Sequence, residues 1–172
     1  MKSYEIFQKM SPDLASEILG YLQKTQTPVF KSVVQTLASQ RNLRPVFIER
    51  KPPPERYTWI KNALGRKPAD TLAAHLLQAW LLGAQKQMLC EFLDSLGVAR
   101  DEDGTVENLP DSPPKEKLRE VTGELLAKYP AENVAVYLHA FHDMDSTVSW
   151  PLLGEVLLEN ERLTLGSIQS SS

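Results

Sequence analysis

The sequence predicts an all-α protein, a compact bundle of about six to eight helices around a central apolar helix near residues 68–96. Apolar residues recur at the three- and four-residue spacing of a helix face through most of the chain. Ser-Pro and Thr-Pro pairs precede several of these stretches, where the hydroxyl caps free amides and proline fits the first turn. Strand signals are scarce, because the Asp-Gly pair at 103–104 is flanked by acidic residues rather than by alternating apolar runs.

The length and composition are those of one folded domain. At 172 residues, with 42% hydrophobic and 24% charged residues, the chain can bury a core without disulfides or metals. We expect a single helical domain over residues 1–166 and a flexible tail over 167–172. The proline-rich segment 45–54 is a possible sub-boundary within that domain.

Prolines punctuate the first half of the chain. Ser-Pro-Asp begins a helix over 11–22, and Thr-Pro begins a second over 27–37, with a short link that favours an antiparallel hairpin. Segment 45–51 fits either a helical turn or an extended stretch, and we favour irregular structure there. The three prolines at 52–54 cannot continue a helix, and the last of them opens the next one, which runs to Leu64.

The most apolar region is 68–96, either one helix or two helices broken at Gly83. Its apolar residues occupy more than one face around 76–84, which predicts burial on all sides. Gly97 fits a left-handed C-terminal cap, and a polar loop follows over 100–111. Three more helices are expected, each after a proline signal: Ser112-Pro113-Pro114, Pro130 and Ser149-Trp150-Pro151.

The net charge of −3 conceals a strong asymmetry along the chain. Residues 1–90 carry 13 Lys and Arg against 6 Asp and Glu, whereas residues 91–172 carry 6 against 16. Such an asymmetry bears on the choice of binding partners. The acidic charge is concentrated in the stretch 101–124.

The basic charge is densest over 41–67, where aromatic residues are interleaved with cations. Cations attract phosphates and aromatic rings stack on unpaired bases, so this stretch is a candidate nucleic-acid surface. A sequence pI of about 5.7 argues against a dedicated nucleic-acid-binding protein. The candidate basic face comprises Arg41, Arg44, Arg50, Lys51, Arg56, Lys61, Arg66 and Lys67, with Tyr57 and Trp59 and the nearby Phe47.

A second interpretation accounts for both charge clusters together. The basic stretch 41–67 is complementary to the acidic stretch 101–124, within one chain or between two copies. Complementary charged patches steer association and fix register, although exposed pairs add little stability. We therefore favour a protein partner or self-association over nucleic acid.

The two histidines on one expected helix are the candidates for a metal site. His139 and His142 are three residues apart, and Asp145 follows closely enough to complete a ligand set; His75 is the third histidine of the chain. A pair of partly exposed histidines near a helix end is the more ordinary interpretation, and no metal is predicted. The acidic turn at 101–106 does not match a calcium-binding loop, because Ala99 and Pro110 occupy two of the ligand positions.

No catalytic motif is present. Cys90 lies between apolar residues, so we expect it to be buried in the core rather than reactive. The chain has no nucleophile elbow, phosphate-binding loop or dinucleotide-binding motif. Catalysis by residues scattered through the fold stays open, but the sequence favours a protein that is not an enzyme and needs no cofactor.

Two resemblances can be stated. Residues 80–86 (WLLGAQK), 88–94 (MLCEFLD) and Leu109-Pro110 resemble a bacterial all-helical family of uncharacterised proteins, over roughly residues 11–165; this resemblance implies a helical fold and no activity or site. Separately, the pattern of Met10, Ser11, Pro12, Ala15, Ile18 and Leu19 is similar to the helical repeats of flagellar-motor and magnesium-transporter regulatory domains.

The sequence thus predicts a helical interaction protein acting through basic (41–67) and acidic (101–124) surfaces. Nucleic-acid binding is the alternative, and an enzyme or metal site at His139 and His142 is a second one. The N-terminus lacks the apolar segment of a signal peptide, no apolar run is long enough to span a bilayer, and one cysteine excludes an internal disulfide. We expect a cytoplasmic protein without a membrane partner.

Overall fold

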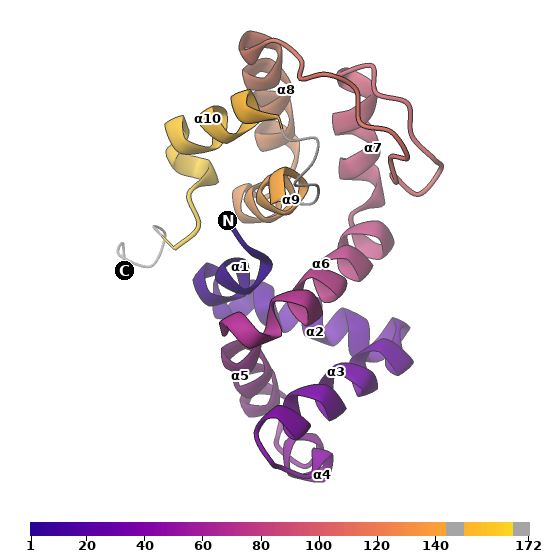
Figure 1. Ribbon diagram of the computed structural model, residues 1–172, viewed down its shortest axis with the longest axis vertical. Helices are drawn as coiled ribbons and strands as arrows, with labels where there is room; N and C mark the ends of the chain where they lie inside the picture. Colours follow the sequence, from indigo (N-terminus) through magenta and orange to yellow (C-terminus); the bar gives the residue numbers. More distant parts are fainter. Residues whose placement is uncertain (144–149, 167–172) are drawn as a thin grey trace. The chain divides into compact units, whose positions relative to one another are not determined.

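The structure is a computed structural model that describes residues 1–143 and 150–166. Its described residues confirm the all-α prediction, with helices throughout and no strand (Figure 1). There are ten α-helices among them, not six to eight, together with two short 3-10 helices. The chain divides into two compact units, which we call the first unit (residues 2–80) and the second unit (residues 81–172).

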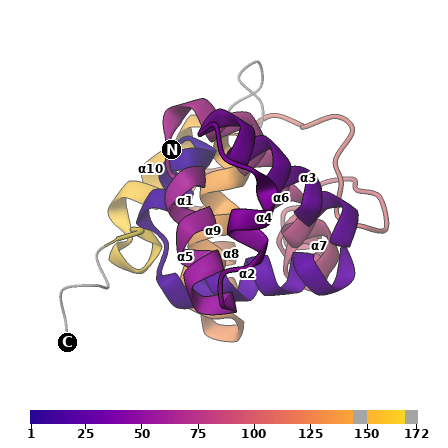
Figure 2. The ribbon, with the colours of Figure 1, turned by 90° about the horizontal axis from the view of Figure 1, so that it is seen from below.

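The first unit is built from short helices that pack around α2. The helix α2 contacts both α3 and α5, and α1 packs against α5. The fully buried side chains that they share include Ile6, Phe7, Ile18, Leu19, Leu22 and Ile60. The elements can be followed from a second direction in Figure 2. They are α1 (Ser3–Lys9), α2 (Pro12–Thr25), α3 (Thr27–Gln40), α4 (Pro45–Glu49), α5 (Pro53–Leu64), η1 (Lys67–Ala69) and most of α6 (Asp70–Ala84).

The second unit has an aromatic core. Phe92, Tyr137 and Phe141 make edge-on contacts with ring centroids 5.5–6.0 Å apart, and Trp150 lies 5.2 Å from Phe141. The indole N–H of Trp150 donates to the carbonyl of Pro110 at 2.9 Å, which ties the long loop to this core. The elements after α6 are α7 (Lys86–Ser95), α8 (Lys115–Lys128), α9 (Ala131–Asp143), α10 (Pro151–Glu159) and η2 (Glu161–Leu163).

Some of the expected helix signals act as predicted. The Oγ of Ser11 accepts a hydrogen bond from the backbone N–H of Leu14 at 3.1 Å, as an N-cap does. Gly97 has φ of 70° just after α7, the left-handed conformation expected of a C-terminal cap. The helix α9 begins directly after Pro130 and α10 at Pro151, whereas Ser149 lies outside the described residues.

Two expected caps are wrong in detail. Thr27 is inside α3, where its hydroxyl donates to the carbonyl of Gln23 at 2.9 Å, and Gln26 occupies the cap position. Ser112 does not cap α8, because its hydroxyl donates to the carbonyl of Pro113 at 3.1 Å and Pro114 precedes the helix. In both places proline alone starts the helix.

The segment that we expected to be irregular, 45–51, is largely helical. Residues Pro45–Glu49 form α4, because Pro45 supplies the backbone conformation of a first turn and Ile48 is fully buried beneath it. Tertiary packing thus decides a segment whose local signals are balanced. The proline-rich stretch 45–54 lies within the first unit, and the prediction of a single domain over 1–166 stays a prediction.

The apolar region 68–96 forms two helices, and the break is at Gln85 rather than Gly83. The expectation of burial on all sides is wrong for α6, because Thr71, His75 and Gln78 are exposed along one side of it. These three residues follow the spacing of a helix face, so α6 is amphipathic. None of the helices in the described ranges is long and apolar enough to cross a membrane.

Candidate functional site

The charge asymmetry follows the division into units. The first unit carries 12 Lys and Arg against 6 Asp and Glu, a net charge of +6. The second unit carries 7 against 16, a net charge of −9. The whole basic stretch 41–67 belongs to the first unit and the whole acidic stretch 101–124 to the second. Each unit therefore carries a strong net charge of its own sign.

Arg56 and Tyr57 of the basic stretch are engaged in holding the first unit together. The guanidinium of Arg56 donates to the carbonyls of Glu49 at 2.8 Å and Lys51 at 3.0 Å. It also donates to Oε1 of Gln23 at 3.3 Å, and the hydroxyl of Tyr57 donates to the same oxygen at 2.7 Å. These contacts join α2, the end of α4 and α5, so both side chains have a structural role.

Three other residues of the candidate basic face, Arg41, Trp59 and Lys61, also make contacts within the first unit. The guanidinium carbon of Arg41 lies 6.0 Å from the ring centroid of Trp59, in a cation–π arrangement, and both residues are half-buried. The ammonium of Lys61 lies 3.5 Å from the carbonyl of Gln8 on α1. Arg41 therefore lies over one face of the half-buried Trp59 ring, which reduces the surface that Trp59 offers for base stacking.

The remaining cations have no partner among the described residues. The side chains of Arg44, Arg50, Lys51, Arg66 and Lys67 make no ion pair and no hydrogen bond there, and all but the half-buried Lys51 are exposed. They fall into two groups, one around α4 and one beyond the end of α5. The twelve residues of α5 separate these groups by a helix length of about 18 Å.

The group around α4 coincides with an exposed apolar surface. Phe47 is 61% exposed and Leu43 is 41% exposed, and among the described residues the third large exposed hydrophobic side chain is Leu158, at 86%. We call Leu43, Arg44, Phe47 and Arg50 the α4 corner; α4 lies at the lower end of the first unit in Figure 1. Apolar side chains flanked by cations are typical of an interaction surface.

Sequence reasoning counted Phe47 among the interleaved aromatic residues but missed Leu43. Of the five residues of α4, Ile48 is the one that is fully buried. Asn42 has φ of 55°, which turns the chain sharply after α3 and leads into the exposed Leu43. The signal in the sequence is the short apolar run Val46-Phe47-Ile48 between prolines, which predicts that some of these side chains are exposed rather than buried in the core.

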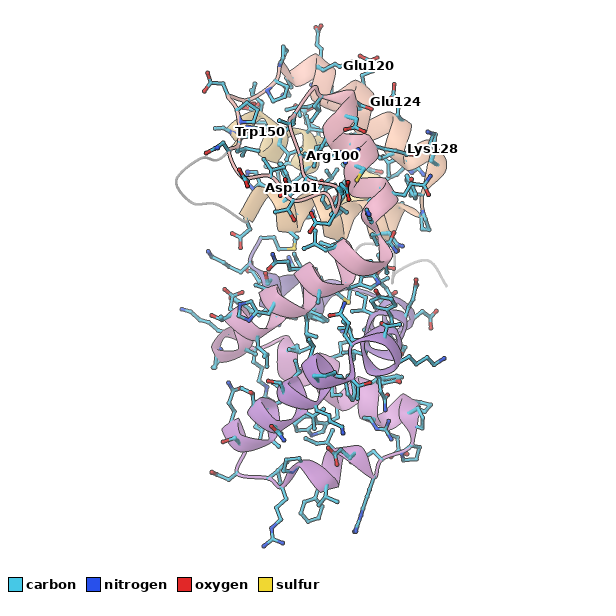
Figure 3. The ribbon with its side chains drawn as sticks, turned by 90° about the vertical axis from the view of Figure 1, so that its right-hand side faces the viewer. Arg100, Asp101, Glu120, Glu124, Lys128 and Trp150 are labelled. Atoms are coloured by element: carbon cyan, nitrogen blue, oxygen red, sulfur yellow. The ribbon has the colours of Figure 1, made fainter. Side chains whose placement is uncertain are left out.

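The acidic stretch 101–124 is a solvated surface of the second unit. Its Asp and Glu residues are all exposed, and Glu120 pairs with Lys117 at 3.6 Å. Glu120, Glu124 and Lys128 follow one another along α8 in Figure 3, which also shows Arg100 and Asp101 on the loop. Hydrogen bonds from the side chain and backbone of Thr105 lower the pKa of Asp103, which stabilises its charged form.

The histidine candidates occupy different environments. His139 is buried, with its Nε2 at 2.9 Å from the carbonyl oxygen of Leu163, so the expectation of partial exposure is wrong for it. His142 is half-buried, and burial lowers its pKa. Asp145 lies outside the described residues, and His75 is on the exposed side of α6 in the first unit. The described parts of the chain hold no group of three or more potential metal ligands.

Cys90 is half-buried, so the expectation that it lies in the core is wrong. It is on the side of α7 that faces the loop, with its Sγ at 3.8 Å from the carbonyl oxygen of Glu102. Its neighbours Leu89 and Phe92 are buried. A thin cover of loop backbone, rather than packed side chains, shields the thiol.

Comparisons with protein-family models, with curated proteins and with solved structures found no match to this chain.

Proposed function

We propose that the protein is a non-enzymatic interaction module and that its α4 corner binds an acidic protein surface. The observation that carries the proposal is the position of two exposed apolar side chains, Leu43 and Phe47, among cations that have no partner in the described structure. Aromatic and arginine side chains are the residues that most often dominate binding energy at protein interfaces. Phe47 would serve as the anchor, and Arg44 and Arg50 would steer and orient the partner.

The acidic stretch 101–124 belongs to the same proposal as a second surface, for a basic partner or for the first unit of another copy. Its exposed carboxylates favour such an association, because opposite charges raise the rate of encounter. We further propose a cytoplasmic location, for which the free Cys90 is the supporting observation. The bacterial all-helical family remains the resemblance that we propose for the chain.

Nucleic-acid binding is the second candidate. The five unpartnered cations around 41–67 favour it, since phosphate attraction needs cations that are not neutralised by carboxylates. Two features favour a protein partner over it. Tyr57 and Trp59 are engaged within the first unit, and Leu43 offers an aliphatic contact that bases do not require.

Fluorescence anisotropy with two labelled probes would test the proposal. One probe is an acidic peptide of glutamates alternating with leucine and phenylalanine, and the other is single-stranded DNA; both are titrated from low to physiological salt. We expect the peptide to bind more tightly at physiological salt, because apolar contacts persist when charges are screened. We expect DNA binding to be weak and to disappear as salt rises.

Variants separate the two candidates. Phe47→Ser with Leu43→Ser, and separately Arg44→Gln with Arg50→Gln, should each weaken peptide binding by about tenfold. Arg66→Gln with Lys67→Gln removes the same charge at the other end of α5, and Leu158→Ser removes an exposed leucine in the second unit; both are controls and should change little. If the two charge variants weaken binding equally, and Phe47→Ser with Leu43→Ser does not weaken it, the results would favour nucleic acid instead.

A further inference from the structure

The first unit has an open groove that shares no residue with the α4 corner. Its volume is about 450 Å³, within the size range of small-molecule sites. Residues of α2, α3, α4 and α5 line it: Gln23, Thr27, Phe30, Lys31, Gln35, Glu49 and Arg56. The groove lies within residues 2–80, so the first unit alone forms it.

The amide of Gln23 is held in one orientation. Its Oε1 accepts hydrogen bonds from Arg56 at 3.3 Å and from the Tyr57 hydroxyl at 2.7 Å. An oxygen that accepts two donors fixes the amide plane and leaves the NH2 group as the free side. This NH2 group has no acceptor among the described residues, so Gln23 offers two hydrogen-bond donors in the lining of the groove.

Cations outnumber anions around the groove. The ammonium of Lys31 is exposed and has no partner in the described structure, and the guanidinium of Arg56 adds a second positive charge. Glu49 supplies one carboxylate, which makes no ion pair there. The lining therefore carries a net charge of +1, which favours an anionic ligand over a neutral or cationic one.

One aromatic residue is part of the lining. Phe30 contributes to the groove with only 4% of its surface exposed, so it offers a ligand a small apolar contact backed by the core. We infer that the groove binds a small organic monocarboxylate, whose carboxylate meets Lys31 and the Gln23 amide while its apolar body rests on Phe30. Charge-assisted hydrogen bonds orient such a ligand, and burial of its apolar body adds affinity.

Chemical-shift titration of the full chain would test this inference. The probes are sodium benzoate, sodium acetate, inorganic phosphate, benzyl alcohol and sodium chloride, and the readout is the side-chain NH2 resonances of Gln23 and Gln35. We expect saturable shifts with benzoate, at a Kd of about 1–10 mM, and weaker binding of acetate, which lacks the apolar body. Benzyl alcohol should give no saturable shift because it carries no charge, and phosphate and chloride should bind more weakly than benzoate because they lack the apolar body.

Three variants localise the binding. Lys31→Gln should raise the benzoate Kd by about fivefold, and Glu49→Gln should lower it by about threefold, because one change removes an attraction and the other a repulsion. Lys24→Gln is the matched control: it removes one exposed cation from α2 at a position that does not line the groove. Unchanged backbone spectra would show that each variant is folded.

Two results would overturn the inference. One is the lack of a saturable shift at Gln23 and Gln35 with benzoate at a concentration tenfold above the expected Kd. The other is an equal effect of Lys24→Gln and Lys31→Gln, which would mean that the ligand responds to overall charge and not to this groove. Neither result bears on the α4 corner, because the groove and the corner share no residue.

Discussion

Arg56 reaches back across seven residues to the carbonyl of Glu49, at 2.8 Å from its Nη2. The last carbonyls of a helix have no partner within the helix, and here a side chain supplies one for α4. The same nitrogen also donates to the carbonyl of Lys51. A cation that the sequence suggested for phosphate binding is thus used to stabilise the segment that carries the α4 corner.

Arg56→Met should lower the free energy of unfolding by about 1–3 kcal/mol, because it removes the donor to the exposed carbonyl of Glu49 and to the partly buried carbonyl of Lys51, and one of the two donors to Oε1 of Gln23. The stabilisation that Arg56 provides is reduced by its own Nε, which is buried without a hydrogen-bond partner among the described residues. Urea denaturation followed by circular dichroism would measure the change. Arg66→Met is the control, because Arg66 is exposed and makes no contact there. Equal effects of the two variants would contradict this role.

The sequence was informative where local chemistry decides the structure. Ser11 caps α2 as its hydroxyl predicts, and Gly97 adopts the left-handed conformation that glycine favours. The helix α4 was missed because contacts distant in sequence decide it, namely the burial of Ile48 and the bonds from Arg56. The basic stretch 41–67 could also be found from the sequence, because charge density depends on composition alone.

Which cations are free could not be read from the sequence. Arg56 is engaged because Gln23 comes close to it, and these residues are 33 positions apart in the chain. The groove depends on the same contact, because that contact fixes the amide of Gln23. Cys90 was assigned to the core from its apolar neighbours, but a period of 3.6 residues places it on the side of α7 that the loop covers.

Gly104 should be intolerant of a side chain for two reasons. Its φ is 89°, and a Cβ atom at this position would lie 3.0 Å from the Cβ of Leu89. We expect Gly104→Ala to cost about 2–3 kcal/mol in a denaturation experiment, from backbone strain and crowding together. Gly97→Ala is the matched control: φ is 70° but no atom lies within 4 Å of the added carbon, so only the strain of about 1 kcal/mol should remain. A similar cost for both variants would show that the loop moves away from α7 without penalty.

The thiol of Cys90 should report on the same loop. The loop partly covers it through the carbonyl of Glu102, at 3.8 Å from Sγ, so we expect labelling by an aromatic disulfide reagent to be faster when the loop opens. Gly104→Ala weakens the contact with Leu89 and should raise the labelling rate several-fold in native buffer. The same rate in both proteins would mean that exposure of Cys90 does not depend on this contact. Labelling of the urea-unfolded chain gives the rate of the free thiol as a reference.

Acidification should destabilise the second unit through His142. Its Nε2 lies only 2.8 Å from the position that a Cβ on Gly154 would take, so the ring packs closely against α10. Burial lowers the pKa of His142 from its usual 6.5, with a smaller opposing effect from Asp143. The unfolded chain therefore binds the proton more readily than the folded chain, and stability that is fully present above pH 6.5 falls as the pH drops below that value.

Thermal denaturation between pH 8 and pH 5 would measure this dependence. His142→Gln lacks the titrating group, so its melting temperature should fall less over this range than that of the wild-type protein. His75→Gln is the control, because His75 is exposed on α6 in the first unit and should leave the pH profile unchanged. Parallel profiles for the wild-type protein and His142→Gln would mean that the contact with Gly154 accommodates the protonated ring, and that carboxylates alone set the acid sensitivity.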